Sequence, residues 1–128
     1  MFLIKHYMDS GGEMVKDCIF CKIIKNEIPS DKVYEDEKIL AFHDIEPEAP
    51  VHILIIPKKH ISSLNEVKKE NADEISYIFT KIPEIAKKLG VEESGYRIVS
   101  NCGEDALQTV DHIHFHMLGK RTLNWPPG

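Results

Sequence analysis

Long hydrophobic runs and clusters of basic residues are both missing from this sequence of 128 residues. No apolar stretch approaches the ~20 residues that cross a bilayer, so we expect no membrane span and no membrane partner. Lys and Arg are scattered, and the formal net charge is −5. A protein that binds polymeric nucleic acid needs many phosphate contacts, so this composition argues against that class. A single nucleotide needs only one pocket and stays compatible with the sequence.

Cysteine is scarce, with three residues, and repeats and low-complexity linkers are absent. The start of the chain has a short apolar run and no small-residue cleavage site, so we do not interpret it as a signal peptide. Few cysteines without a leader indicate a reducing compartment, and we expect a cytoplasmic protein. We expect one domain over residues 14–128. Residues 1–13 are predicted to be a flexible extension, or to lie upstream of a start at Met14.

The spacing of apolar residues predicts an α+β fold. We expect a short helix within residues 17–29, capped by Asp17, then a hairpin of residues 32–36 and 38–45 and a buried strand over 51–57. A helical stripe covers 71–90, with Asn71 and Glu74 as a capping box, and Pro83 predicts a kink or a later start. Residues 95–101 and 112–118 are predicted to be strands. The sequence therefore predicts two helices and an antiparallel sheet of about five strands.

The strand 112–118, "HIHFHML", alternates three histidines with large apolar residues. Alternate side chains of a strand point to opposite faces, so Ile113, Phe115 and Met117 should face the core while the imidazoles share the other face. A histidine-rich surface is one interpretation. The others are a metal site, or a histidine nucleophile toward phosphorus with neighbours that bind phosphate. The spacing alone leaves these two open.

Other polar and apolar residues favour a nucleotide pocket. Asn101, Gln108 and Thr109 lie in a polar loop just before the strand and offer hydrogen-bond donors to a phosphate. Asp44 ends a predicted strand, and its carboxylate could accept from a ribose diol. Ile19, Phe20, Ile23 and Phe42 could sandwich a base, although each could equally be a core residue.

These motifs together resemble the histidine triad (HIT) superfamily, whose signature alternates three histidines with apolar residues. "HIHFHML" fills that signature, and the similarity covers about residues 17 to 128. The segments "AFHDI", "IPKKHIS" and "WPPG" are similar to the Hint branch, the purine nucleoside phosphoramidases. The resemblance implies a HIT fold that joins a second sheet in a homodimer. It also implies a hydrolase that cleaves purine nucleoside 5′-phosphoramidates or acyl adenylates to the nucleoside monophosphate.

The resemblance also implies a role for each matching residue. His114 corresponds to the nucleophile that forms a nucleotidyl-histidine intermediate, and His116 to a histidine that contacts the phosphate of a purine nucleotide such as AMP. Asp44 corresponds to the ribose-binding acid. The remaining matches are Gln108, Thr109 and Asn101 near the phosphate, the base-pocket residues Ile19, Phe20, Ile23, Phe42, His43 and Ile45, His52 beside the triad, and Trp125 near the partner's site.

The motif "CIFC" departs from the common Hint pattern. Cys-x-x-Cys in such a chain is typical of redox or zinc sites. Some bacterial relatives pair this motif with two histidines around zinc, which here correspond to His60 and the first triad residue, His112. The resemblance thus implies a closed, structural zinc site of Cys18, Cys21, His60 and His112; the alternative is a pair of packed thiols. Cys102 is expected to be an ordinary buried thiol. Ala106-Leu107 replaces Gly-Gly of the eukaryotic branch and predicts a stiffer loop.

Two other functions stay open from the sequence. One is a zinc-dependent hydrolase that uses the triad, His112, His114 and His116, as metal ligands. The other is a nucleotide-binding or partner-binding module with little turnover. The sequence does not distinguish adenine from guanine as the preferred base, since an apolar sandwich accepts either.

Overall fold

The computed structural model describes residues 17–128, so the extension predicted for residues 1–13 and the start at Met14 lie outside the described part. The elements run in the order α1 (Ile19–Ile24), β1 (Lys32–Glu35), β2 (Ile39–His43), β3 (Val51–Pro57), a 3₁₀ turn (Leu64–Glu66), α2 (Ala72–Lys88), β4 (Tyr96–Val99) and β5 (Phe115–Gly119). Across residues 17–128, no helix has the length and apolarity to cross a bilayer. The predicted two helices and five strands are confirmed, whereas the 3₁₀ turn was not expected.

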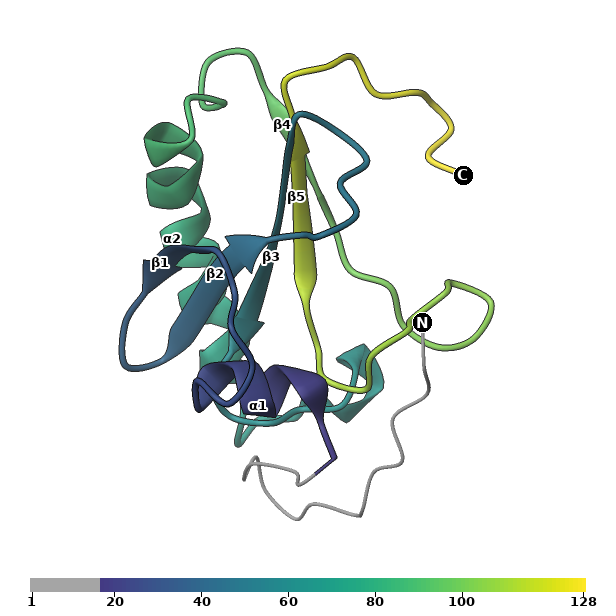
Figure 1. Ribbon diagram of the computed structural model, residues 1–128. Coiled ribbons are helices and arrows are strands. Elements are labelled where there is room, and N and C mark those ends of the chain that lie inside the picture. Colours follow the sequence, from purple (N-terminus) through teal and green to yellow (C-terminus); the bar gives the residue numbers. More distant parts are fainter. Residues whose placement is uncertain (1–16) are drawn as a thin grey trace.

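The strands form one antiparallel sheet in the order β1-β2-β3-β5-β4 (Figure 1). β3 lies at the centre, where Leu54 pairs with Phe42 of β2 on one side and with His116 of β5 on the other. A central strand is covered on both faces, which explains why its sequence, "VHILIIP", is almost continuously apolar rather than alternating.

Each face of the sheet is covered by one helix. Ile53 and Ile55 of β3 belong to the core that includes Ile78 and Ile85 of α2. Leu54, the residue between them, belongs to the second core with α1. Successive side chains of β3 therefore point in turn to the face covered by α2 and to the face covered by α1. Figure 1 shows α2 along one face and α1 at the end of the sheet where β5 begins.

The histidine segment is only partly a strand. β5 begins at Phe115, so His112 and His114 precede it, contrary to the predicted strand 112–118. The cause is a change of partner, since Ile113 N–H donates to the Ile61 carbonyl at 2.6 Å, beyond the end of β3. The predicted separation of faces is confirmed: Ile113, Phe115 and Met117 lie in the α2 core.

Three details of the helix ends differ from prediction. Cys18, not Asp17, is the N-cap of α1, and its Sγ accepts the Cys21 N–H at 3.3 Å. Asn71 forms no capping bond in α2, because its side chain already binds Lys68 N and Glu66 O. α2 begins at Ala72 and continues past Pro83, so the late start was wrong.

A carboxylate in the β1–β2 turn ties this hairpin to α2. Asp36 accepts hydrogen bonds from Tyr34 OH at 2.8 Å and Tyr77 OH at 2.6 Å, and from the N–H groups of Lys38 and Ile39. Partial burial alone would raise the pKa of Asp36. The hydrogen bonds outweigh burial and lower the pKa from its ordinary 3.8 to about 2.

We expect Asp36→Asn to lower the free energy of unfolding by about 2 kcal/mol at pH 7, because an amide cannot accept from all four donors. The folded pKa lies below the ordinary value, so this stabilisation is complete above pH 3.8 and is lost as pH falls through about 2. Urea unfolding between pH 2 and 7 measures it. Glu37→Gln, an exposed neighbour in the same turn, serves as control. A pH-independent difference would contradict the assignment.

Candidate functional site

A cavity of about 530 Å³ opens between α1, β2 and the histidine segment. Eleven residues implied by the sequence line it, and the structure brings them together from five separate segments. They are Ile19, Phe20, Ile23, Phe42, His43, Asp44, Ile45, His52, Thr109, His114 and His116. The side chains from α1 and β2 give an apolar slot, and the histidines give it a polar end.

Three of the nucleotide-site residues implied by the resemblance do not line this cavity. Gln108 instead closes its own loop, donating to Ser62 O at 2.8 Å and to Val110 O at 3.0 Å and accepting from Gly103 N–H at 3.0 Å. Trp125 is 80% exposed, and the Cζ atom of Arg97 lies over its ring, 5.7 Å from the ring centroid. Asn101 is half-buried outside the lining.

Seven further lining residues were missed by the sequence interpretation. They are Pro29, Ser30, Asp31, Glu46, Glu48, Leu54 and Val110. Leu54 could have been found, because it alternates with His52 along β3 and so shares its face. The loop residues have no periodicity, and only the folded chain brings them to the cavity.

His114 is held in the form that a nucleophile requires. Its Nδ1 lies 2.8 Å from the carbonyl oxygen of His112, and a carbonyl can only accept, so Nδ1 carries the proton. The lone pair is therefore on Nε2. The side chain is only 5% exposed, and this burial lowers the pKa of His114 below its ordinary 6.5. A neutral imidazole with its lone pair on one defined nitrogen results.

A chain of hydrogen bonds sets the tautomer of His116. Glu48 N–H donates to His52 Nδ1 at 2.9 Å, so His52 carries its proton on Nε2. This nitrogen lies 2.9 Å from His116 Nδ1, which must accept. His116 is therefore protonated on Nε2, a buried atom without a hydrogen-bond partner among residues 17–128. Burial, followed by His114 and His52, lowers the pKa of His116 to about 4, so the ring is a neutral donor at pH 7.

The same chain of bonds argues against a metal ion at this end of the cavity. Asp44, His52 and His116 place one donor atom each within 4.8 Å of one another, as a metal site would. However, His52 Nδ1 already accepts from a backbone N–H, so its Nε2 carries the proton and has no lone pair to offer. Asp44 Oδ2 lies 3.4 Å from that nitrogen, beside a neutral imidazole whose pKa burial lowers.

The loop before the triad contains a strained residue, Leu107, which was compared above with the second glycine of the related branch. Leu107 has φ of +63°, a left-handed conformation that favours glycine, and its side chain is 76% exposed. The bonds of Gln108 close this loop and hold the strained turn. A glycine at this position could adopt such a φ without strain, and the predicted stiffness of the loop stays a prediction.

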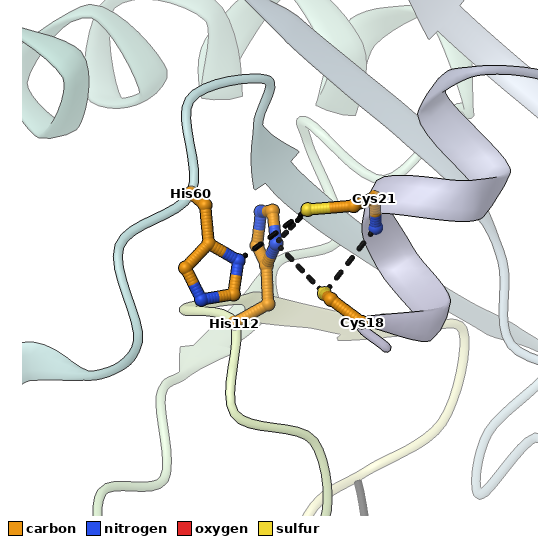
Figure 2. A group of neighbouring side chains, drawn as sticks. All are labelled: Cys18, Cys21, His60 and His112. Carbon is orange, nitrogen blue, oxygen red and sulfur yellow. Dashed lines mark hydrogen bonds between the residues drawn. The ribbon is translucent and has the colours of Figure 1, made fainter. Parts of the chain in front are cut away.

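On the other side of the histidine segment, two cysteines and two histidines meet (Figure 2). His112 Nδ1 lies 3.3 Å from Cys18 Sγ and 3.6 Å from Cys21 Sγ, and His60 Nδ1 lies 3.4 Å from Cys21 Sγ. All four side chains are buried, and their donor atoms lie within 4.8 Å of one another. All four residues implied as ligands are thus brought together. Cys102, expected to be buried, is half-buried and lies outside this group.

The geometry of this Cys₂His₂ group fits a tetrahedral zinc ion. Zinc bonds of about 2.3 Å to sulfur and 2.0–2.1 Å to nitrogen put tetrahedral S and N ligands about 3.5 Å apart, close to the contacts found. His112 Nε2 lies 2.9 Å from the Pro57 carbonyl, so it carries the proton and Nδ1 is left as ligand. The hydrogen bond with Cys21, and then burial, raise the pKa of Cys18. A cation would reverse this preference and favour the thiolate.

His112 joins the two groups. Its side chain faces the cysteines, while its carbonyl accepts the Nδ1–H of His114. Phe20 of α1 packs edge-on against the imidazoles of His112 and His114, with ring centroids 5.8 Å and 5.3 Å apart. His112 thus faces the cysteines, whereas His114 and His116 line the cavity, and the three imidazoles do not form one metal-binding set among the described residues.

Comparisons with known proteins agree with this arrangement. The HIT domain model matches residues 25–123. A 14 kDa zinc-binding protein of Zea mays is 51% identical over 112 residues, covering 86% of this chain and 87% of its own. A HIT family hydrolase from Legionella pneumophila is 48% identical with a TM-score of 0.84, covering 87% of this chain and 99% of its own. A histidine triad nucleotide-binding protein from Candida albicans is 40% identical with a TM-score of 0.73, covering 85% and 82%. This chain belongs to the histidine triad (HIT) family.

Proposed function

We propose that this protein hydrolyses purine nucleoside 5′-phosphoramidates or acyl adenylates, with His114 as the nucleophile. The observation that carries this proposal is the tautomer of His114, a residue that lines the cavity. Its Nδ1–H is bound by the His112 carbonyl at 2.8 Å, which leaves the lone pair on Nε2. A neutral imidazole is a competent nucleophile near pH 7. The HIT family hydrolase from Legionella pneumophila and the nucleotide-binding protein from Candida albicans support this assignment.

The reaction follows in two steps. His114 Nε2 attacks the α-phosphorus, a phosphorus–nitrogen bond to the ring forms, and the bond to the leaving group breaks. An amine leaves with a proton taken up from water, and the hydrolysis step returns that proton; an acyl group leaves as the carboxylate and needs none. The His116 Nε2–H and the Thr109 hydroxyl bind the phosphate oxygens and stabilise their developing charge. Water then cleaves the bond to His114, which releases the nucleoside monophosphate and restores the neutral ring.

The rest of the cavity matches a purine nucleoside. Ile19, Phe20 and Ile23 of α1 face Phe42 and Leu54 of the sheet, and together they form a slot for a flat base. Asp44 lies between this slot and the histidines. Its Oδ1 accepts from Glu46 N–H at 2.8 Å, which holds the carboxylate in place to accept from a ribose diol.

We further propose that Cys18, Cys21, His60 and His112 hold a structural zinc ion. Four protein ligands close the coordination sphere, so the metal would stabilise the packing of α1 against the histidine segment and leave the chemistry to His114. The zinc-binding name of the Zea mays relative supports this site.

We also propose that the protein forms a homodimer. β4 is an edge strand whose outer backbone groups face away from the sheet, so a second copy could extend it across a twofold axis. In such a dimer the exposed Trp125 would lie near the partner's cavity and help to select the leaving group.

Turnover of adenosine 5′-phosphoramidate to AMP tests the function, and Asp44→Ala tests the nucleoside pocket. We expect the wild type to release AMP, and Asp44→Ala to raise KM about tenfold for the ribonucleotide, through loss of charged hydrogen bonds to the diol. KM for the 2′-deoxy substrate should change less than threefold. Initial rates on both substrates measure this. Equal effects on both would refute the ribose contact, and no wild-type turnover would refute the function.

A further inference from the structure

Two buried polar side-chain atoms have no hydrogen-bond partner within residues 17–128, namely His116 Nε2 and Ser30 Oγ. Both residues line the same cavity. A buried polar group without a partner is costly, and a bound ligand is one way to satisfy it. The proposed phosphate accounts for the histidine. The hydroxyl of Ser30 has no role in the function proposed above.

Ser30 belongs to the segment Pro29–Asp31, which connects α1 to β1 and supplies one wall of the cavity. The Asp31 carbonyl accepts from His43 N–H at 2.9 Å and fixes this segment beside the end of β2. The histidines and Thr109 lie at the phosphate end, Asp44 at the ribose position, and apolar side chains on the two faces of the slot. The other acidic lining residues, Glu46 and Glu48, are tied through their N–H groups to Asp44 and His52. Ser30 and Asp31 come instead from the connection between α1 and β1, and we assign this separate wall to the edge of the base.

We propose that Ser30 and Asp31 bind the Watson–Crick edge of the purine and that this cavity selects guanine over adenine. The inference rests on the proposed nucleotide function and adds the identity of the base. The Ser30 hydroxyl can donate to guanine O6 or accept from the adenine amino group, so it serves both bases. The Asp31 carboxylate only accepts. It matches the N1–H and N2–H donors of guanine and opposes the N1 lone pair of adenine.

The charge of the cavity leaves Asp31 available for this contact. Within residues 17–128, its lining contains four carboxylic acids, Asp31, Asp44, Glu46 and Glu48, and neither Lys nor Arg. No cation of the lining therefore neutralises Asp31, and a base with two donors is favoured at this wall. The hydroxyl contributes affinity for either purine, and the carboxylate contributes the discrimination between them.

Calorimetric titration of GMP, IMP and AMP tests the proposal in the wild type, Ser30→Ala and Asp31→Asn. We expect the wild type to bind GMP about tenfold tighter than AMP, with IMP between them because it has N1–H but no 2-amino group. In Asp31→Asn the ratio should fall to about twofold or less, since an amide both donates and accepts. Glu27→Gln removes a nearby exposed charge outside the lining and should keep the wild-type ratio.

Ser30→Ala has a second readout that a structural role would not produce. Its hydroxyl has no hydrogen-bond partner among the described residues, so the variant should melt at or above the wild-type temperature while it binds all three nucleotides about threefold more weakly. Equal wild-type affinities for GMP and AMP, an unchanged ratio in Asp31→Asn, or a lower melting temperature in Ser30→Ala would each overturn the proposal. Equal affinities with intact phosphoramidate turnover would overturn the base preference alone, whereas absence of all nucleotide binding would overturn the proposed function as well.

Discussion

Replacing His114 with Ala should lower kcat for adenosine 5′-phosphoramidate by about 10⁴-fold or more, because no covalent intermediate can form without the nucleophile. His114 lines the cavity, and the carbonyl of His112 keeps the proton on Nδ1, so that Nε2 has the lone pair. Rates measured by release of AMP give the loss. Denaturing mass spectrometry of the wild type during turnover should show one nucleotidyl adduct per chain, located at His114.

Two controls separate this loss from unfolding or from loss of binding. The variant should melt near the wild-type temperature and still bind AMP, because Ile19, Phe42 and Asp44 are unchanged in the cavity. His116→Ala should retain more activity than His114→Ala, since it removes one donor to the phosphate and not the nucleophile. Turnover by His114→Ala within tenfold of the wild type would show that another group attacks phosphorus.

Replacing Cys18 or Cys21 with Ser should reduce bound zinc from one ion per chain to nearly none. A site that loses one of four ligands binds zinc far more weakly, and the binding free energy of a structural zinc is part of the folding free energy. We expect the free energy of unfolding to fall by about 3 kcal/mol or more at saturating zinc, with a decrease in melting temperature of about 10 °C or more. Metal analysis and thermal unfolding of the purified chain measure both.

Cys102→Ser is the matched control, because Cys102 is half-buried and lies outside the ligand group. It should change neither the zinc content nor the melting temperature. At temperatures where the Cys18 variant remains folded, its kcat should stay within about tenfold of the wild type, since a closed site takes no part in the reaction. Unchanged zinc content in both variants would refute the metal site.

Much of the fold could be predicted because its helices and strands each bury one regular row of apolar side chains. The apolar stripe of α2 and the alternation of Ile113, Phe115 and Met117 identify the core faces without the structure. The boundaries were harder because they depend on distant partners. His112 and His114 lie outside β5 because Ile113 pairs with Ile61, a residue whose proximity no local pattern reveals.

The candidate site could be predicted only as far as its residue types carry a motif. The structure places Cys18, Cys21, His60 and His112 together, and the cavity contains most of the residues implied by the resemblance. The motif could not predict the tautomers, since these follow from the partners of each ring nitrogen, such as Glu48 N–H at His52. It could not predict the Gln108 contacts either, because they depend on how the loop closes.

The side-chain and main-chain roles of His112 differ in what mutation can change. Its imidazole faces the cysteines, whereas its contact with His114 is made by the main-chain carbonyl. Every residue type carries that carbonyl, so a lineage that loses its cysteines can exchange this imidazole and keep the acceptor for the nucleophile. At this one position, the metal ligand and the hydrogen-bond acceptor for the nucleophile can therefore change independently. A lineage can lose the zinc site without losing the acceptor that holds His114.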